Sequence, residues 1–177
     1  MRTARGWRAE NTDVQGIGTA LQSAGVRDVD RAAVLGAGGT AAAAAVALAS
    51  LGARHVEVVV REPARAGDLV RVLDRLGVDS GVSRLEQAGV LSAPVVVSTV
   101  PAAGQEAVAQ LPWWAGQTVL DVLYAGWPTP LAQRVADAGG TAVSGIEVLF
   151  WQAAAQVELM TGQPAPLAAM RAALDTR

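Results

Sequence analysis

A strand, a glycine turn and a helix follow one another in residues 33–51, and their spacing suits the binding of a dinucleotide. Gly36, Gly38 and Ala41 have G-x-G-x-x-A spacing between an apolar strand end and an alanine-rich helix. The first glycine permits a tight turn, the second lets the backbone approach a pyrophosphate, and the small third residue allows close packing of helix and strand. The phosphates then lie at the positive end of the helix. Because Gly and Ala are abundant here, the strand–turn–helix context gives the motif its value.

The end of the next strand indicates which dinucleotide is bound. Residues 55–60 are mostly valine, which is typical of a buried parallel strand, and Arg61 follows with Arg65 four residues later. An NAD site usually has Asp or Glu at this place to bind the ribose hydroxyls. Two guanidiniums instead suit the 2′-phosphate of NADP. Glu62 could take the ribose role, and the arginines could be a solvated helix start. The pattern favours NADP, with NAD as the alternative.

Composition excludes several classes of function. A chain of 177 residues that is 51% hydrophobic can form one domain, residues 1–177, with a sizeable core. Its net charge of −2 argues against a nucleic-acid partner. The chain has no cysteine and a single histidine, His55, which argues against a metal site. All 14 basic residues are arginine, so no lysine is present.

The long uncharged stretch at residues 32–53 is not interpreted as a membrane span. It contains the glycines of the turn and consists mostly of alanine, which is only weakly apolar. No apolar segment follows the first arginines, so a secretory leader is not expected either. We therefore expect a cytoplasmic protein without a membrane partner.

Strands and helices alternate along the chain. This order predicts an α/β, Rossmann-like fold, doubly wound, with a mostly parallel sheet and helices on both faces. The expected strands end at Leu35 or span residues 55–60, 78–82, 94–99, 118–122 and 141–143. The expected helices span residues 11–24, 41–51, 64–76, 105–110, 130–138, 145–161 and 167–174. The first of these helices is predicted to begin with a capping box between Thr12 and Gln15.

Several polar residues could contact a ligand. Asp13 lies in the first turn of a predicted helix, where an acidic residue stabilises the positive helix end. An ionised carboxylate there could also accept a hydrogen bond from a substrate hydroxyl. Thr99 and Tyr124 lie at or just after predicted strand ends, where open α/β sheets bind ligands. Gln152 and Gln156 share one face of an apolar helix, so each requires a partner, either a protein group or a ligand.

Taken together, these segments resemble the cofactor-binding, C-terminal domain of the shikimate dehydrogenase family. The resemblance covers essentially the whole chain, and its motifs are specific in their order and spacing. They are Asn11-Thr12-Asp13, Gly36-Ala37-Gly38-Gly39, Arg61, Ser98-Thr99-Val100-Pro101, Asp121-Val122-Leu123-Tyr124, Thr129-Pro130-Leu131, Gly145 and Gln152-Ala153-Ala154.

The resemblance implies NADP-linked, reversible reduction of 3-dehydroshikimate to shikimate, a step of aromatic amino-acid and chorismate biosynthesis. Asp13 matches the catalytic aspartate of the family, which pairs with a lysine and holds the substrate hydroxyls. Tyr124 and Gln152 match substrate contacts, and Gly145 and Val148 match residues that approach the nicotinamide. The full set expected to bind the cofactor is Gly36, Ala37, Gly38, Gly39, Thr40, Arg61, Arg65, Thr99, Val122, Gly145 and Val148.

Two departures from the family pattern modify this expectation. The family often has Asn-Arg-Thr or Asn-Arg-Ser where this chain has Val60-Arg61-Glu62. In the family, a substrate domain carrying the catalytic lysine precedes the Asn-Thr-Asp motif, and residues 145–177 pack toward it. Only ten residues precede that motif here. We therefore expect a chain that binds NADP but needs the substrate domain as a partner for turnover. The alternatives are a quinate or shikimate dehydrogenase that uses NAD, and a non-catalytic NADP-binding module.

Overall fold

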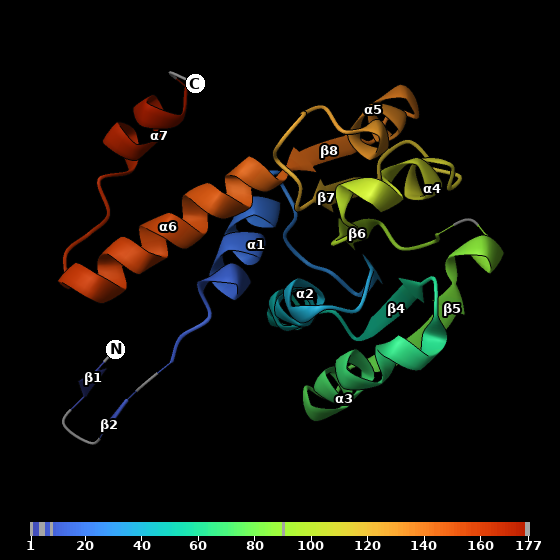
Figure 1. Ribbon diagram of the computed structural model, residues 1–177, viewed down its shortest axis with the longest axis horizontal. Coiled ribbons are helices and arrows are strands. Elements are labelled where there is room, and N and C mark those ends of the chain that lie inside the picture. Colours follow the sequence, from blue (N-terminus) through green and yellow to red (C-terminus); the bar gives the residue numbers. More distant parts are fainter. Residues whose placement is uncertain (1, 4–5, 8, 90, 176–177) are drawn as a thin grey trace.

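The computed structural model describes the chain except for residues 1, 4–5, 8, 90 and 176–177 (Figure 1). Its centre is a six-stranded, all-parallel sheet with the order β5-β4-β3-β6-β7-β8. The strands are β3 (Arg31–Leu35), β4 (His55–Val60), β5 (Asp79–Arg84), β6 (Val95–Ser98), β7 (Thr118–Asp121) and β8 (Thr141–Ser144). The predicted doubly wound α/β fold is confirmed.

The strand order places a topological switch point in the middle of the sheet. From β3 the chain runs outward through β4 to β5, then returns to pair β6 with the other side of β3 and continues to β7 and β8. The connections that leave β3 and β6 therefore run in opposite directions. In open α/β sheets such a point forms the crevice where ligands bind, at the carboxyl ends of the strands.

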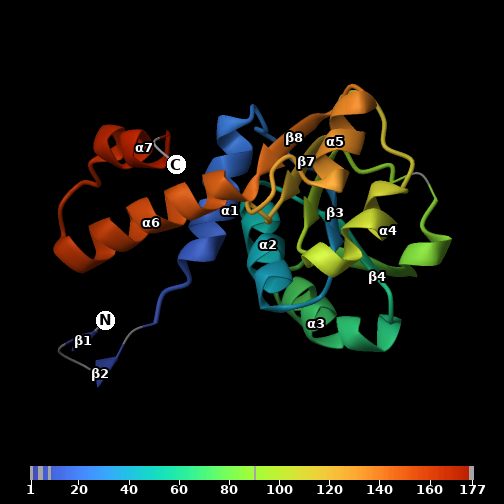
Figure 2. The ribbon, with the colours of Figure 1, turned by 45° about the horizontal axis from the view of Figure 1, so that its top comes forward.

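Helices cover both faces of the sheet (Figures 1 and 2). One face packs against α1 (Thr12–Ser23), α2 (Gly39–Ser50), α3 (Gly67–Arg75) and α6 (Gly145–Thr161), the other against α4 (Gln105–Ala109) and α5 (Pro130–Asp137). Neighbouring residues of one strand alternate between these cores: Val34 faces the first and Leu35 the second. Burial on both faces explains why the inner strands β3, β6 and β7 are mostly apolar, whereas the edge strand β5 is polar.

The alanine-rich segment after the glycine turn is an ordinary buried helix of this fold. Ala41, Ala43, Ala44 and Ala45 of α2 are all at most 2% exposed, and their small side chains let the helix lie close to the sheet. Among the described residues, no helix is long and apolar enough to cross a membrane.

Three local expectations were wrong at element boundaries. The cap of α1 is Asn11, whose Oδ1 accepts a hydrogen bond from the backbone N of Asp13 (3.0 Å), so Thr12 is the first helical residue rather than the cap. A 3-10 turn at Pro63–Ala66 precedes α3, where one continuous helix was expected. Strand β5 continues to Arg84, two residues beyond the predicted end. The first and third differences arise because a side-chain cap and strand pairing, rather than local composition, set these element ends.

Two peripheral segments complete the molecule. An antiparallel pair of short strands, β1 (Arg2–Thr3) and β2 (Gly6–Trp7), was not predicted and extends away from the sheet domain (Figures 1 and 2). At the other end, α7 (Leu167–Asp175) folds back toward α6. Arg171 fastens it there with hydrogen bonds of 2.7 and 2.8 Å to Glu147, and its guanidinium lies 3.8 Å from the centre of the Phe150 ring.

A glycine lets α1 pack very closely against α6. A Cβ atom added to Gly16 would lie 2.7 Å from the carbonyl oxygen of Val148 and 3.1 Å from Cβ of Gln152. Gln156, one turn further along α6, donates a hydrogen bond of 3.1 Å to the hydroxyl of Thr12 at the start of α1. The two helices therefore run antiparallel, and the first turn of α1 lies beside the middle of α6.

We predict that Gly16→Ala destabilises the fold. The new methyl group collides with the backbone of α6, which can yield only if the helices move apart, so the free energy of unfolding should fall by about 1–3 kcal/mol. Gly18→Ala is the matched control in the same helix, because its Cβ would only touch Ala47 at 4.0 Å. That control should change stability by less than about 1 kcal/mol. Urea unfolding of both variants checks this, and equal effects would contradict it.

Candidate functional site

The glycine turn lies at the switch point and is tied to β6. Gly36 has a φ of +105°, which strongly favours glycine, and its N donates to the carbonyl of Val59 (2.9 Å). Thr99 follows β6, and both its N (2.8 Å) and its hydroxyl (2.9 Å) donate to the carbonyl of Leu35. A Cβ on Gly36 would collide with that hydroxyl. Gly36 is therefore required both by backbone conformation and by the space that Thr99 occupies.

The start of α2 is open and has no side-chain cap. Gly38 is the N-cap residue in an extended conformation, and no side chain accepts hydrogen bonds from the first turn, which also lacks an acidic residue. Gly38 and Gly39 are exposed, and a Cβ on either would meet nothing within 4 Å. Thr40 and Ala37 beside them are half-buried. The free backbone N–H groups at this positive helix end suit an anionic group such as a pyrophosphate.

Next to this turn, the loop after β4 carries exposed arginines. Arg61 and Arg65 are both exposed, and neither makes an ion pair within the part of the chain that the structure describes. Glu62 between them does have a partner: Nη2 of Arg84 lies 3.4 Å from its Oε1. Arg84 was missed in the sequence. The strand predicted at residues 78–82 had to end beside β4 if it paired with β4 in parallel. Because that predicted strand ended two residues before Arg84, the sequence did not place Arg84 next to Glu62.

Helices α1 and α6 bring Asp13 and Gln152 into the same region. Both side chains are half-buried, and neither makes a hydrogen bond to another described residue. Gln156, in contrast, is occupied by Thr12. Of the two glutamines that required a partner, one therefore has a protein partner and the other remains available to a ligand.

The loop after β7 brings Tyr124 to the start of α6. The N of Gly145 donates to the carbonyl of Leu123 (3.1 Å), and a Cβ on Gly145 would collide with the backbone of Val122. Val122 is half-buried, and the Tyr124 side chain is 54% exposed. Val148, one turn into α6, is only 6% exposed and packs in the core. Of the residues expected to approach the nicotinamide, Gly145 is thus fixed against the strand end, whereas the side chain of Val148 is mostly covered.

A buried carboxylate that belongs to one of the family motifs, but was not among the expected site residues, holds this loop. Asp121 is 1% exposed and accepts hydrogen bonds from the hydroxyl of Thr129 (2.7 Å), the N of Leu123 (3.3 Å) and the amide of Gln105 (3.5 Å). Thr129 also caps α5 by accepting from the N of Ala132 (3.1 Å). Asp121 thus joins both ends of the loop that carries Tyr124. Burial raises the pKa of its carboxyl above the ordinary value of 3.8, although these hydrogen bonds oppose the rise.

The residues predicted to bind the cofactor lie mostly in the loops and helix starts that follow β3, β4, β6 and β7, at the carboxyl ends of these strands. One hollow lies elsewhere, over the amino-terminal halves of β3 and β4, where Arg31, His55 and Glu57 line it. Another lies between α1 and α2, beside Gln15 and Ser50. Within the described residues, no three His, Cys, Asp or Glu side chains gather as metal ligands would. The uncapped start of α2 and the exposed guanidiniums of Arg61 and Arg65 are suited to anion binding and hydrogen bonding.

We predict that Asp121 makes stability depend on pH. Because the pKa of the Asp121 carboxyl is raised in the folded state, the folded protein binds its proton more tightly than the unfolded chain does. The stabilisation is complete below pH 3.8 and is lost as the pH rises through the raised pKa. Asp121→Asn cannot titrate, so its free energy of unfolding should lack this decrease. Urea unfolding of both proteins from about pH 4 to pH 8 measures the difference. Glu106→Gln, which removes an exposed carboxylate, is the control, and parallel profiles for wild type and Asp121→Asn would contradict the prediction.

Comparison with known proteins places these features in one family. The family described as "Shikimate 5'-dehydrogenase C-terminal domain" matches residues 145–174. The "Shikimate dehydrogenase (NADP(+))" of Anaeromyxobacter dehalogenans strain 2CP-1 is 40% identical over 183 residues, covering 99% of this chain and 65% of that protein. This chain therefore spans about two thirds of the length of that relative.

Solved structures agree with the sequence comparison. The crystal structure of Mycobacterium tuberculosis shikimate dehydrogenase is similar with a TM-score of 0.85 and 42% identity, covering 100% of this chain and 66% of the other. Quinate dehydrogenase from Corynebacterium glutamicum in complex with NAD is similar with a TM-score of 0.83 and 25% identity, covering 95% of this chain and 63% of that one. With this fold, this switch-point geometry and relatives of this similarity, the chain belongs to the shikimate dehydrogenase family.

Proposed function

We propose that this chain binds NADP and forms part of the substrate site of an enzyme that interconverts 3-dehydroshikimate and shikimate. The observation that carries the proposal is the uncapped start of α2 at the switch point, beside Arg61 and Arg65 without ion pairs. The first turn of α2 has no acidic side chain to balance the positive helix end, and the guanidiniums beside it are unpaired within the described residues. This arrangement suits a ligand with both a pyrophosphate and a separate phosphate. The printed names of the relatives, which specify NADP(+), support the same ligand.

The residues present fit such a cofactor. The N–H groups at the start of α2 would bind the pyrophosphate, with Gly38 and Gly39 leaving room for close approach. Arg61 and Arg65 would bind the 2′-phosphate bidentately, as guanidiniums can. Gly145, held against the backbone of Val122, would present a surface without a side chain to the nicotinamide. The chemistry that NADPH supplies when bound is a hydride for the substrate carbonyl.

The substrate side of the proposal assigns binding roles to three side chains. Asp13 would accept a hydrogen bond from a substrate hydroxyl, Gln152 would contribute its unpaired amide, and Tyr124 would border the site from the loop after β7. A developing alkoxide needs a cation and a proton donor nearby. The chain contains no lysine, so we propose that the catalytic lysine is supplied from outside these 177 residues.

A second candidate keeps the reaction class but changes both ligands. The likeness to a quinate dehydrogenase in complex with NAD, together with an acidic residue in the loop after β4, favours quinate and NAD. Initial rates with quinate and shikimate, each with NAD and NADP, would separate the two candidates once the substrate domain is supplied. A third possibility, a non-catalytic NADP-binding module, would bind the cofactor but remain inactive under every one of these conditions.

We predict that the isolated chain binds NADPH more tightly than NADH. Arg61→Gln combined with Arg65→Gln should weaken NADPH binding by about 100-fold or more, since each lost charge-assisted hydrogen bond is worth roughly 1.5 kcal/mol or more. Binding of NADH should change little. Titration followed by tryptophan fluorescence measures both affinities. Arg134→Gln, an exposed arginine of α5, is the control. A wild-type preference for NADH would reject the role assigned to the two arginines.

We also predict that Asp13 matters for turnover rather than for cofactor binding. The chain alone should not oxidise shikimate, but it should do so when joined to the substrate-binding part of a relative. In that joined protein, Asp13→Asn should lower kcat by about 100-fold or more, because it removes the charged acceptor that positions the substrate hydroxyl. The affinity for NADPH should stay the same. Asp28→Asn, an exposed carboxylate beyond the end of α1, is the control. Undiminished activity of Asp13→Asn would refute the assignment.

A further inference from the structure

The loop proposed to bind a phosphate contains a carboxylate. Glu62 follows Arg61 directly, at the place where an acidic residue in an NAD site accepts a hydrogen bond from the ribose 2′-hydroxyl. A free carboxylate here would favour NADH in two ways, because it would bind the hydroxyl and repel the 2′-phosphate. A preference for NADPH therefore requires something that neutralises Glu62 or turns it aside.

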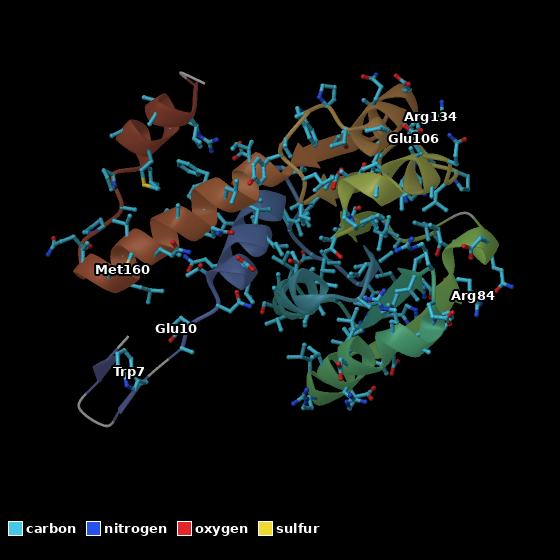
Figure 3. The ribbon with its side chains drawn as sticks, viewed as in Figure 1. Trp7, Glu10, Arg84, Glu106, Arg134 and Met160 are labelled. Atoms are coloured by element: carbon cyan, nitrogen blue, oxygen red, sulfur yellow. The ribbon has the colours of Figure 1, made fainter. Side chains whose placement is uncertain are left out.

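The structure contains a residue placed to do this. Arg84 is the last residue of β5 and lies opposite Val60 in the parallel register, so the two strand ends meet at the same edge. Nη2 of Arg84 lies 3.4 Å from Oε1 of Glu62, and Nη1 lies 3.5 Å from the carbonyl oxygen of Arg61. Figure 3 shows Arg84 at the β5 edge of the sheet, far from Trp7 and Met160. The guanidinium thus bridges the end of β5 and the loop after β4.

Within the described residues, the Glu62 carboxylate has no other interaction. It precedes the 3-10 turn at Pro63–Ala66 but makes no capping hydrogen bond to that turn. The local turn uses only the backbone of Glu62, whose carbonyl accepts a hydrogen bond from the N of Arg65 (3.0 Å). The pair is half-exposed, with side chains 45% and 54% accessible, so it contributes little to overall stability. Its location beside the proposed phosphate site points to a role in ligand choice.

We propose that Arg84 is a specificity-determining residue that makes Glu62 compatible with NADPH. By pairing with Glu62, it draws the carboxylate toward β5 and offsets its charge, so that Arg61 and Arg65 face the 2′-phosphate without a competing anion. This rests on the proposed function, in which these two arginines bind that phosphate. Arg84 acts through Glu62 in this scheme and is not itself a phosphate ligand.

The test is a double-mutant cycle on the full 177-residue chain, with NADPH and NADH titrated separately by fluorescence. Arg84→Gln should weaken NADPH binding by about two- to fivefold, the range expected when a screened charge pair is lost. NADH binding should stay equal or become tighter, because Glu62 is released to the ribose. In the Glu62→Gln background, Arg84→Gln should change neither affinity. Arg134→Gln controls for loss of one positive charge, and circular dichroism of each variant confirms that it is folded.

Three results would overturn the inference. Equal weakening of NADPH by Arg84→Gln in both backgrounds would mean that Arg84 contacts the phosphate directly. Equal weakening of NADPH and NADH would mean that the substitution disturbs the loop. No effect of Arg84→Gln on NADPH would mean that the pair is irrelevant to ligand choice. Failure of the wild-type chain to bind either dinucleotide would instead reject the proposed function, and the inference with it.

Discussion

The candidate site depends on the way Thr99 holds β6 against the glycine turn. Its N and its hydroxyl both donate to the carbonyl of Leu35, and the hydroxyl occupies the space that a side chain on Gly36 would need. This contact joins the two strands from which the chain leaves in opposite directions. It thereby sets the position of the start of α2 relative to the loops after β6 and β7, which is where an open α/β sheet binds its ligand.

Two further glycines allow close backbone contacts that position α6 and α1, the helices of the proposed substrate side, relative to the sheet. Gly145 lets the start of α6 lie against the backbone at Val122, and Gly16 lets α1 lie against α6. A helix pressed this closely against its neighbour has few alternative positions. The two glutamines of α6 differ in their partners. The Gln156 amide donates a hydrogen bond to Thr12, whereas the Gln152 side chain makes none to a described residue and is available to a ligand.

The acidic and basic groups of the site differ in burial, and their roles differ accordingly. Asp121 is buried, so its carboxylate serves structure: three donors fix it, and it joins both ends of the loop that carries Tyr124. Arg61, Arg65 and Arg84 are exposed around a single carboxylate, Glu62. Solvent screens such a cluster, so it adds little to stability, but its excess of positive charge is suited to an anion.

Local signals in the sequence were sufficient for the fold class and for the framework of the site. The strands alternating with helices, the glycine turn and the bounds of Gly145–Thr161 were predicted correctly, because apolar periodicity and glycine act within a few residues. Only the tertiary structure decided which polar groups are occupied. Arg84 meets Glu62 across 22 positions of the chain, and Gln156 meets Thr12 across 144. Such partners are set by strand register and helix packing, which no short sequence pattern contains.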